Sequence, residues 1–512
     1  MRLLTHSEMN KTWNWALTVA LAGFLFGFDT VVISGANDPI KELWPTSPWF
    51  HGVFIMSMAL WGTVLGSLAG GIPTKRLGRK KTLVWVGILY LVSALGSGLA
   101  TDPYMFSFFR FLGGVGVGAS TVAAPTYISE ISTAKSRGRL VALYQFNIVF
   151  GILIAYISNY LLAGFDGDND WRWMLGVEAI PAALYCVLIL GVPKSPRWLV
   201  IQQNDEAGAL NTLKLIHNDP VKAKAEFDTI KNHTSFETSR KGVFSGKYNK
   251  SLILAFLLAF FNQLSGINFV LYYAPDILKE AGFVTTYTSP PEGTSVLNNS
   301  ESAPDNNEDE HTSSDKVSAA NETQAEKSAE SDSTKKDFAE NDEPDRSESL
   351  LASVAIGGTN LLFTFLGLFL IDRMGRKSLM YIGSAGYIIS LAMVAYGFYS
   401  GASAGFNLFF ILLFIASHAV GQGAVIWVFI SEIFPNNVRA AGQAWGTGTH
   451  WVFAALITML GEVVTDAFQG WMIFTFFAAF MVLQLLFTHF MMPETKGISL
   501  EDLQDQLTVK DV

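Results

Sequence analysis

The sequence contains a single cysteine, Cys186, and few charged residues for a chain of 512. One cysteine excludes an intramolecular disulfide, and its place inside an apolar stretch is typical of a packing residue rather than a reactive thiol. We find no P-loop, no metal-spaced cluster of Cys and His, and no hydrolase nucleophile motif, so the sequence predicts neither an enzyme nor a metal site. Only 15% of the residues are charged and 50% are hydrophobic. This balance indicates a membrane protein.

Long apolar runs account for most of the hydrophobic residues. A helix crosses the hydrocarbon layer of a membrane with about 20 apolar residues. Twelve runs of about this length occur, at 13–33, 52–72, 82–100, 105–127, 141–162, 173–192, 252–273, 350–371, 379–399, 406–430, 441–464 and 471–492. Residues 1–10 lack the apolar core and cleavage site of a secretory signal, so we expect the first run to be a retained helix. The predicted fold class is an all-α membrane protein with twelve transmembrane helices.

Basic residues gather in one set of the short connections between these runs. They lie at 75–81, 135–139 and 373–377, whereas a connection of the other set carries Asp166, Asp168 and Asp170. The positive-inside rule then places both chain ends in the cytoplasm. We expect a multi-pass protein of a cell membrane, either a plasma membrane or a bacterial inner membrane.

The stretch 285–348 differs in composition from the rest of the chain. It holds 17 acidic and 5 basic residues, so the formal net charge of -9 comes from this stretch. Its scarcity of apolar residues predicts a disordered insert, which the orientation places outside the cell. A ligand-binding or regulatory role stays open beside the simpler interpretation, a solvated acidic loop.

The two halves of the chain resemble each other. Three segments recur in the same order, 76–80 as 373–377, 127–131 as 429–433, and 193–197 as 493–497. A six-helix unit repeated in the same orientation predicts two bundles with a substrate site between them near the membrane midplane. The predicted parts are an N-terminal bundle at 1–192, a cytoplasmic linker with short helices at 193–250, a C-terminal bundle at 251–492 that contains the insert, and a cytoplasmic tail at 493–512.

Charged residues of these repeats lie at the predicted cytoplasmic helix ends. They can simply fix orientation and cap helices. The fixed spacing of Glu and Arg in both halves favours a second interpretation, in which Arg–carboxylate bonds between the bundles close the inner side and break when it opens. The candidate residues of this cytoplasmic gate are Arg76, Arg79, Glu130, Arg137, Arg197, Asp372, Arg373, Arg376, Glu432, Arg439 and Glu494.

With these motifs the chain resembles the sugar porter family of the major facilitator superfamily, which includes proton-sugar symporters and facilitative glucose transporters. The likeness covers nearly the whole chain apart from the acidic insert. It rests on residues 27–30, 33–35, 76–80, Arg110 with its Gly-rich tail, 125–130, 137–139, 171–173, 195–199, 263–275, 372–377, 427–435 and 493–497. The resemblance implies import of a monosaccharide with a proton by alternating access. We expect no cofactor besides the proton, no nucleic-acid partner, and a functional monomer in the lipid bilayer.

The seventh apolar run offers groups suited to a sugar. A monosaccharide needs amides that donate and accept hydrogen bonds, together with aromatic walls. Asn262, Gln263, Asn268 and Tyr272 supply such groups, and Gly266 is expected to loosen the helix between them, although interhelical hydrogen bonding is an alternative. The resemblance implies sugar contacts for Gln145, Gln263, Asn268, Tyr272, Asn360 and Trp427, and aromatic walls formed by Phe26 and Trp451.

Two positions of this site depart from the family pattern. Asn262 and His450 stand where xylose-transporting members have Gln, so the resemblance does not identify the sugar. His450 is either a sugar contact or a packing histidine. Lys75 and Lys194 likewise replace acidic or amide residues of the family, which predicts a weaker inner gate in the first half than in the second.

Asp29 lies deep within the first run, where an uncompensated charge is costly. We expect Arg110 of the fourth run to be its partner, either in a static ion pair or in a switch that lets Asp29 hold and release a proton. In the resembling symporters this Asp couples the proton, whereas facilitative members carry Asn. Asp29 therefore predicts symport, with a uniporter, a symporter of a cyclitol such as inositol and a non-transporting sugar sensor as alternatives. Weaker candidates for buried ionisable sites are Glu178, His418, Glu462 and His489.

Overall fold

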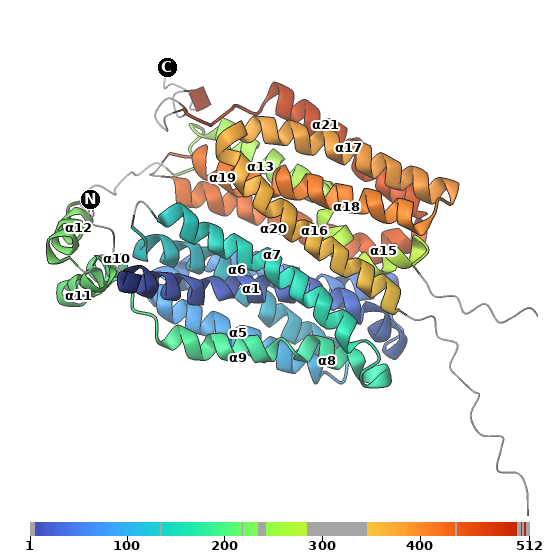
Figure 1. Ribbon diagram of the computed structural model, residues 1–512, viewed down its shortest axis with the longest axis horizontal. Helices are drawn as coiled ribbons and strands as arrows, with labels where there is room; N and C mark the ends of the chain where they lie inside the picture. The colour runs from blue at the N-terminus through green and yellow to red at the C-terminus, as the bar shows by residue number, and fades with distance from the viewer. Residues whose placement is uncertain are drawn as a thin grey trace, which may run out of the picture. The chain divides into compact units, whose positions relative to one another are not determined.

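The computed structural model describes residues 6–133, 136–217, 219–233, 242–283, 346–435, 438–498, 503 and 506–507. Helices dominate the described part of the chain, and no strand occurs among these residues. The predicted insert lies outside the described residues up to Asp345. Residues 6–283 and 346–507 form one compact unit as far as they are described. The blue to teal helices of the first half and the yellow to red helices of the second half lie in two groups (Figure 1).

The first half contains six membrane-crossing segments, some of them built from more than one element. Its elements are α1 (His6–Leu43), α2 (Pro48–Phe50), η1 (His51–Met56), α3 (Met58–Ala69), α4 (Gly71–Arg76), α5 (Arg79–Gly98), α6 (Pro103–Ile131), α7 (Arg137–Leu162), η2 (Gly167–Asn169), α8 (Asp170–Gly176) and α9 (Ala179–Leu190). Short elements follow in the predicted linker, namely α10 (Pro196–Trp198), η3 (Leu199–Gln203), α11 (Glu206–His217) and α12 (Pro220–His233).

The second half repeats this plan. Its elements are α13 (Asn249–Leu264), α14 (Ile267–Tyr272), α15 (Ala274–Glu280), α16 (Ser347–Met374), α17 (Arg376–Ser400), α18 (Ala404–Val420), α19 (Gln422–Glu432), α20 (Arg439–Ala467) and α21 (Gly470–Phe490). Among the described residues, 11 helices are long and apolar enough to cross a membrane, or 12 if the pair Pro48–Met56 and Met58–Ala69, bent by 44°, is one span. The predicted fold class is confirmed.

The first helix extends beyond its predicted run. The apolar run ends at Ile33, whereas α1 continues to Leu43. Asn37, Asp38 and Lys41 interrupt the hydrophobic pattern, but each has a polar partner on another helix, so the helix continues through them. A buried polar group tolerated in this way does not mark a helix end.

Glycines allow the helices of the first half to approach closely. A Cβ atom at Gly114 of α6 would lie 1.8 Å from the carbonyl oxygen of Ala59 on α3, and one at Gly27 of α1 would lie 1.9 Å from the carbonyl oxygen of Ile148 on α7. Small residues at helix contacts are typical of membrane bundles, where packing replaces the hydrophobic effect. Between the halves, α7 packs against α16 and α3 packs against α20.

Candidate functional site

The seventh membrane-crossing helix is broken in its middle. α13 ends at Leu264, Gly266 adopts a left-handed conformation with φ of 84°, and α14 begins at Ile267. A Cβ at Gly266 would lie 2.6 Å from the ring of Phe477, so both the backbone and the space require glycine. The Asn268 amide donates to Oε1 of Gln263 at 2.8 Å across the break. The break therefore turns amides of both segments toward each other.

A buried amide network surrounds this break. The amide nitrogen of Gln263 lies 3.1 Å from each ring nitrogen of His450 on α20. Nδ2 of Asn262 donates to Oε1 of Gln422 at 3.3 Å, and the Tyr387 hydroxyl donates to the same oxygen at 3.2 Å. Gln422 and Tyr387 are both fully buried. The predicted amides thus form one network.

Residues beyond the predicted set complete this network. Gln422 begins α19 directly after Gly421, where the tenth run breaks into two helices. The Tyr387 hydroxyl also lies 2.6 Å from Nδ1 of His418, which joins a weaker candidate to the network. Sequence reasoning missed Gln422 and Tyr387. The available signal was a lone Gln between two glycines, Gly421 and Gly423, inside an apolar run.

A row of aromatic rings leads from the second half to the first. The ring centroids of Trp427 and His450 are 4.9 Å apart, those of His450 and Trp451 are 4.8 Å apart, and those of Trp451 and Phe26 are 5.5 Å apart. Phe26 belongs to α1, so the row joins the two halves. Nε1 of Trp451 is buried and has no hydrogen-bond partner among the described residues. An indole N–H in this position is a free donor for a hydroxyl ligand.

The remaining predicted sugar contacts lie on neighbouring helices. Gln145 is half-buried on α7, and Asn360 is buried on α16, the helix that packs against α7. Tyr272 is fully buried and lies within electrostatic reach of Asp29 and Arg110. Tyr272 belongs to the same short helix, α14, as Asn268 of the amide network.

Asp29 and Arg110 form the predicted buried pair. Nη1 of Arg110 donates to the Asp29 carboxylate, and Nη2 donates to the Asp29 backbone oxygen at 3.0 Å. Each side chain is 2% exposed. A second carboxyl group, that of Glu178, is buried near this pair, and its Oε1 has no hydrogen-bond partner among the described residues. Two carboxyls beside one guanidinium leave one negative charge that a proton can neutralise.

At the predicted cytoplasmic gate, Arg and Glu side chains pair within each half rather than between the halves. Nη2 of Arg79 lies 2.8 Å from Glu130 in the first half, and Arg376 binds Glu432 at 2.8 and 3.2 Å in the second. The prediction placed such bonds between the bundles. The local order explains the difference, because α5 and α6 pack side by side in the first half, and α17 and α19 do so in the second.

The two halves differ where Lys194 and Glu494 occupy corresponding positions. The Glu494 carboxylate accepts hydrogen bonds from the backbone N–H groups of Arg376 and Lys377 at 3.0 Å each, at the start of α17. Burial raises the pKa of Glu494, but hydrogen bonds from four backbone amides outweigh burial and hold this pKa below its usual value. Lys194 cannot accept such bonds, and α5 has no side-chain cap.

The other candidate gate residues have different surroundings. Arg76 and Arg197 are exposed, and Arg376 Nη1 lies 3.5 Å from the exposed Asp372. The Arg373 guanidinium lies 3.9 Å above the Phe369 ring, and Nε of Arg439 donates to the backbone oxygen of Phe434 at 3.2 Å. The side chain of Arg137 lies outside the described residues.

Comparison with known proteins places this architecture in a family. The profile of the family described as "Sugar (and other) transporter" matches residues 15–294 and 342–507. The chain is 30% identical to the arabinose-proton symporter of Bacillus subtilis over 94% of this chain and 92% of the relative. It is 30% identical to the galactose-proton symporter of Escherichia coli K12, over 98% and 95%.

A solved structure agrees with these relatives. The xylose transporter of Escherichia coli in a partially occluded inward-open conformation matches with a TM-score of 0.75 and 26% identity, over 96% of this chain and all of that one. The match covers both halves and includes the helices that carry the amide network. The chain belongs to the sugar transporter family of the major facilitator superfamily.

Proposed function

We propose that this protein imports a monosaccharide together with a proton by alternating access, across a cell membrane with both chain ends in the cytoplasm. The observation that carries this proposal is the buried group of Asp29, Arg110 and Glu178. The relatives named as proton symporters of arabinose and galactose support the same substrate class. The proton is the coupling ion, and the protein works as a monomer.

The amide network and the row of rings bind the sugar. Gln263, Asn268 and Gln422 present carboxamides that bind hydroxyls as donor and acceptor, and the Trp451 indole N–H donates. The rings of Phe26 and Trp451, from different halves, cover the apolar faces of the sugar. A sugar that contacts both halves draws them together, which favours the occluded state. His450 and Asn262 shape the side of the site that selects among sugars.

The carboxyl groups of Asp29 and Glu178 carry the transported proton. While Arg110 binds the Asp29 carboxylate, the buried Glu178 carboxyl has no hydrogen-bond partner for its Oε1 among the described residues, and we assign the proton to Glu178 in this state. When the site opens to the cytoplasm, rearrangement of the helices moves Arg110 from Asp29 toward Glu178, which favours the charged form of Glu178, and the proton is released inside. A new proton binds from outside after the site has opened outward again, so the charge of the group rises by one on uptake and falls by one on release.

Uptake of radiolabelled monosaccharides and inositol into proteoliposomes tests this function. With an inward proton gradient, we expect one sugar to accumulate above equilibrium in the wild type, and the Asp29→Asn variant to equilibrate it without accumulation. Equal, gradient-independent equilibration by both proteins would identify a uniporter. Inositol as the only accumulated compound would identify a cyclitol symporter, and binding without uptake would identify a sensor.

A further inference from the structure

Seven polar side chains meet where the C-terminal part of α1 faces α15 and α20. In Figure 1, α15 lies at the end of the helices far from α10–α12. The first half contributes Asn37, Asp38, Lys41 and His51, and the second half contributes Asp276, Lys279 and Glu462; we call this group the inter-half cluster. None of these residues belongs to the amide network or to the group around Asp29. Their function is therefore separate from the binding steps described above.

Hydrogen bonds and ion pairs of the cluster run across the two halves. Nδ2 of Asn37 donates to Asp276 at 3.0 Å and to Glu462 at 3.2 Å, and Lys41 pairs with Glu462 at 2.8 Å. Lys279 binds Asp38. These contacts exist only while the halves are together at this end, because opening separates α1 from α15 and α20.

The cluster contains one carboxyl group more than it has cations. Lys41 pairs with Glu462 and Lys279 pairs with Asp38, whereas Asp276 accepts a hydrogen bond from the neutral amide of Asn37. Three carboxyl groups beside two cations leave one negative charge in excess, and this excess favours protonation of one carboxyl. One bound proton neutralises the cluster.

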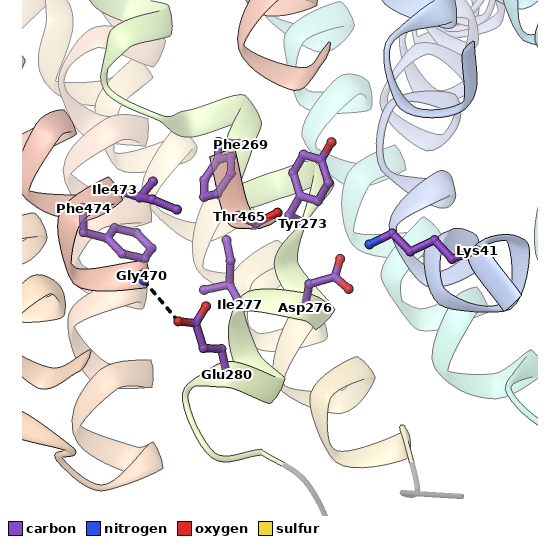
Figure 2. A pocket seen from close by; sticks show the side chains of 10 residues that line it. All are labelled: Lys41, Phe269, Tyr273, Asp276, Ile277, Glu280, Thr465, Gly470, Ile473 and Phe474. Carbon is purple, nitrogen blue, oxygen red and sulfur yellow. Dashed lines mark hydrogen bonds between the residues drawn. The ribbon is translucent and has the colours of Figure 1, made fainter. Parts of the chain in front are cut away.

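A small cavity beside the inter-half cluster can hold water. A cavity of about 70 Å³ lies beside Asp276, and Lys41, Tyr273, Glu280 and Thr465 also line it. Figure 2 shows the Asp276 carboxyl and the Lys41 ammonium directed toward each other at its edge. Such a volume holds about two water molecules, each of which occupies about 30 Å³ in the liquid. Water there gives a proton a path to the carboxyl.

We propose that Asp276 is a second proton-binding site, and that a proton bound to Asp276 stabilises closure of the two halves at this end. The ligand is a proton rather than a metal ion, because the described residues contain no group of His, Cys, Asp and Glu suited to hold a metal. Closure at this end depends on pH through this site. On the orientation proposed above, the pH outside the cell controls it.

The groups around Asp276 set the direction of the pH effect. Asp276 lies beyond Tyr272, the last residue of the candidate span, and burial together with the nearby Asp38 carboxylate raises its pKa well above the usual value, while Lys41 opposes this shift. The other titratable groups of the cluster and its cavity are His51 on η1, Glu462 on α20, and Tyr273, Lys279 and Glu280 beside Asp276 in sequence. Glu42 of α1 and Glu348 of α16 are exposed, and Arg346, which precedes α16, binds Asp170.

Opening at this end exposes Asp276 to water and returns its pKa toward the usual value. The closed state therefore binds the proton more tightly than the open state. Closure is favoured at low pH and weakens as the pH rises through the pKa of Asp276 in the closed state. One proton changes the ratio of closed to open protein by at most about tenfold per pH unit.

Distances between spin labels on the two halves test this site. Labels replace two exposed residues at this end, Asp168 and Ser400, through Asp168→Cys and Ser400→Cys in a Cys186→Ser background. Pulsed electron paramagnetic resonance then gives the closed and open populations of the full chain between about pH 4 and pH 9. The measurement needs neither sugar nor gradient, so it gives a result even if the proposed transport function fails.

We expect the wild type to open progressively as the pH rises. The Asp276→Asn variant mimics the protonated carboxyl and stays closed across the range, and Asp38→Asn moves the transition to lower pH. Glu280→Gln is the matched control, since Glu280 lines the same cavity but accepts a hydrogen bond from the Gly470 N–H. We expect the closed population of Glu280→Gln to change with pH as it does in the wild type. A pH-independent wild type, an unshifted Asp38→Asn curve, or a Glu280→Gln curve changed as much as that of Asp276→Asn overturns the proposal.

Discussion

Replacing Gly266 by alanine tests whether the break in the seventh helix holds the site in place. The residue has φ of 84°, a conformation that costs an L-amino acid about 1–2 kcal/mol. The new Cβ would also lie 2.6 Å from the Phe477 ring, and overpacking of this kind costs about 1–3 kcal/mol. We therefore expect Gly266→Ala to destabilise the protein by about 2–5 kcal/mol, the sum of the two effects.

Gly164 provides the matched control for this substitution. Its φ is 72°, but a Cβ there meets no atom within 4 Å, so Gly164→Ala carries only the backbone cost of about 1–2 kcal/mol. The midpoint of thermal unfolding in detergent is measured for both variants, and sugar binding is followed by tryptophan fluorescence. We expect a lower midpoint and weaker binding for Gly266→Ala. Equal midpoints together with unchanged binding would refute the reasoning, because Phe477 would then exert no constraint.

Three further substitutions follow from the site. Gln422→Leu removes a carboxamide that we propose binds a sugar hydroxyl. Loss of that hydrogen bond at a buried site costs about 1–3 kcal/mol, so we expect sugar to bind roughly 5- to 150-fold more weakly in equilibrium titrations; an unchanged Kd contradicts this. Glu178→Gln keeps the shape but loses the second proton position, so we expect exchange of sugar across the membrane to continue while gradient-driven accumulation stops; full accumulation contradicts it. Lys194→Glu supplies an acceptor at the start of α5, as Glu494 does for α17, and we expect it to stabilise the first half and slow uptake, whereas unchanged uptake kinetics count against it.

Most of the fold follows from patterns that the sequence displays directly. Apolar runs of the right length predict the membrane helices, and the repeated segments predict two six-helix halves. The errors fall where polar residues interrupt an apolar run. Asn37 and Asp38 ended the predicted first run, yet α1 continues through them because partners on other helices satisfy them. A partner distant in sequence cannot be inferred from periodicity alone.

The site could be predicted only in part for the same reason. The broken seventh helix was expected from Gly266, because glycine favours backbone conformations that interrupt a helix. Arg110 was expected beside Asp29, because an unpaired carboxylate within the membrane costs free energy. Gln422 and Tyr387 emerged only with the structure, since their importance rests on hydrogen bonds between helices. The gate Arg residues were expected to pair across the bundles, but the geometry of neighbouring helices pairs Arg79 and Arg376 within each half.

The most direct measurement of the central claim is proton movement driven by sugar. Proteoliposomes without an imposed gradient are suspended in weakly buffered medium, and the accumulated sugar identified by the uptake panel is added outside. We expect alkalinisation of the medium by the wild type and none by the Asp29→Asn variant, although both take up sugar. Uptake by the wild type without any change in external pH would contradict proton coupling through Asp29.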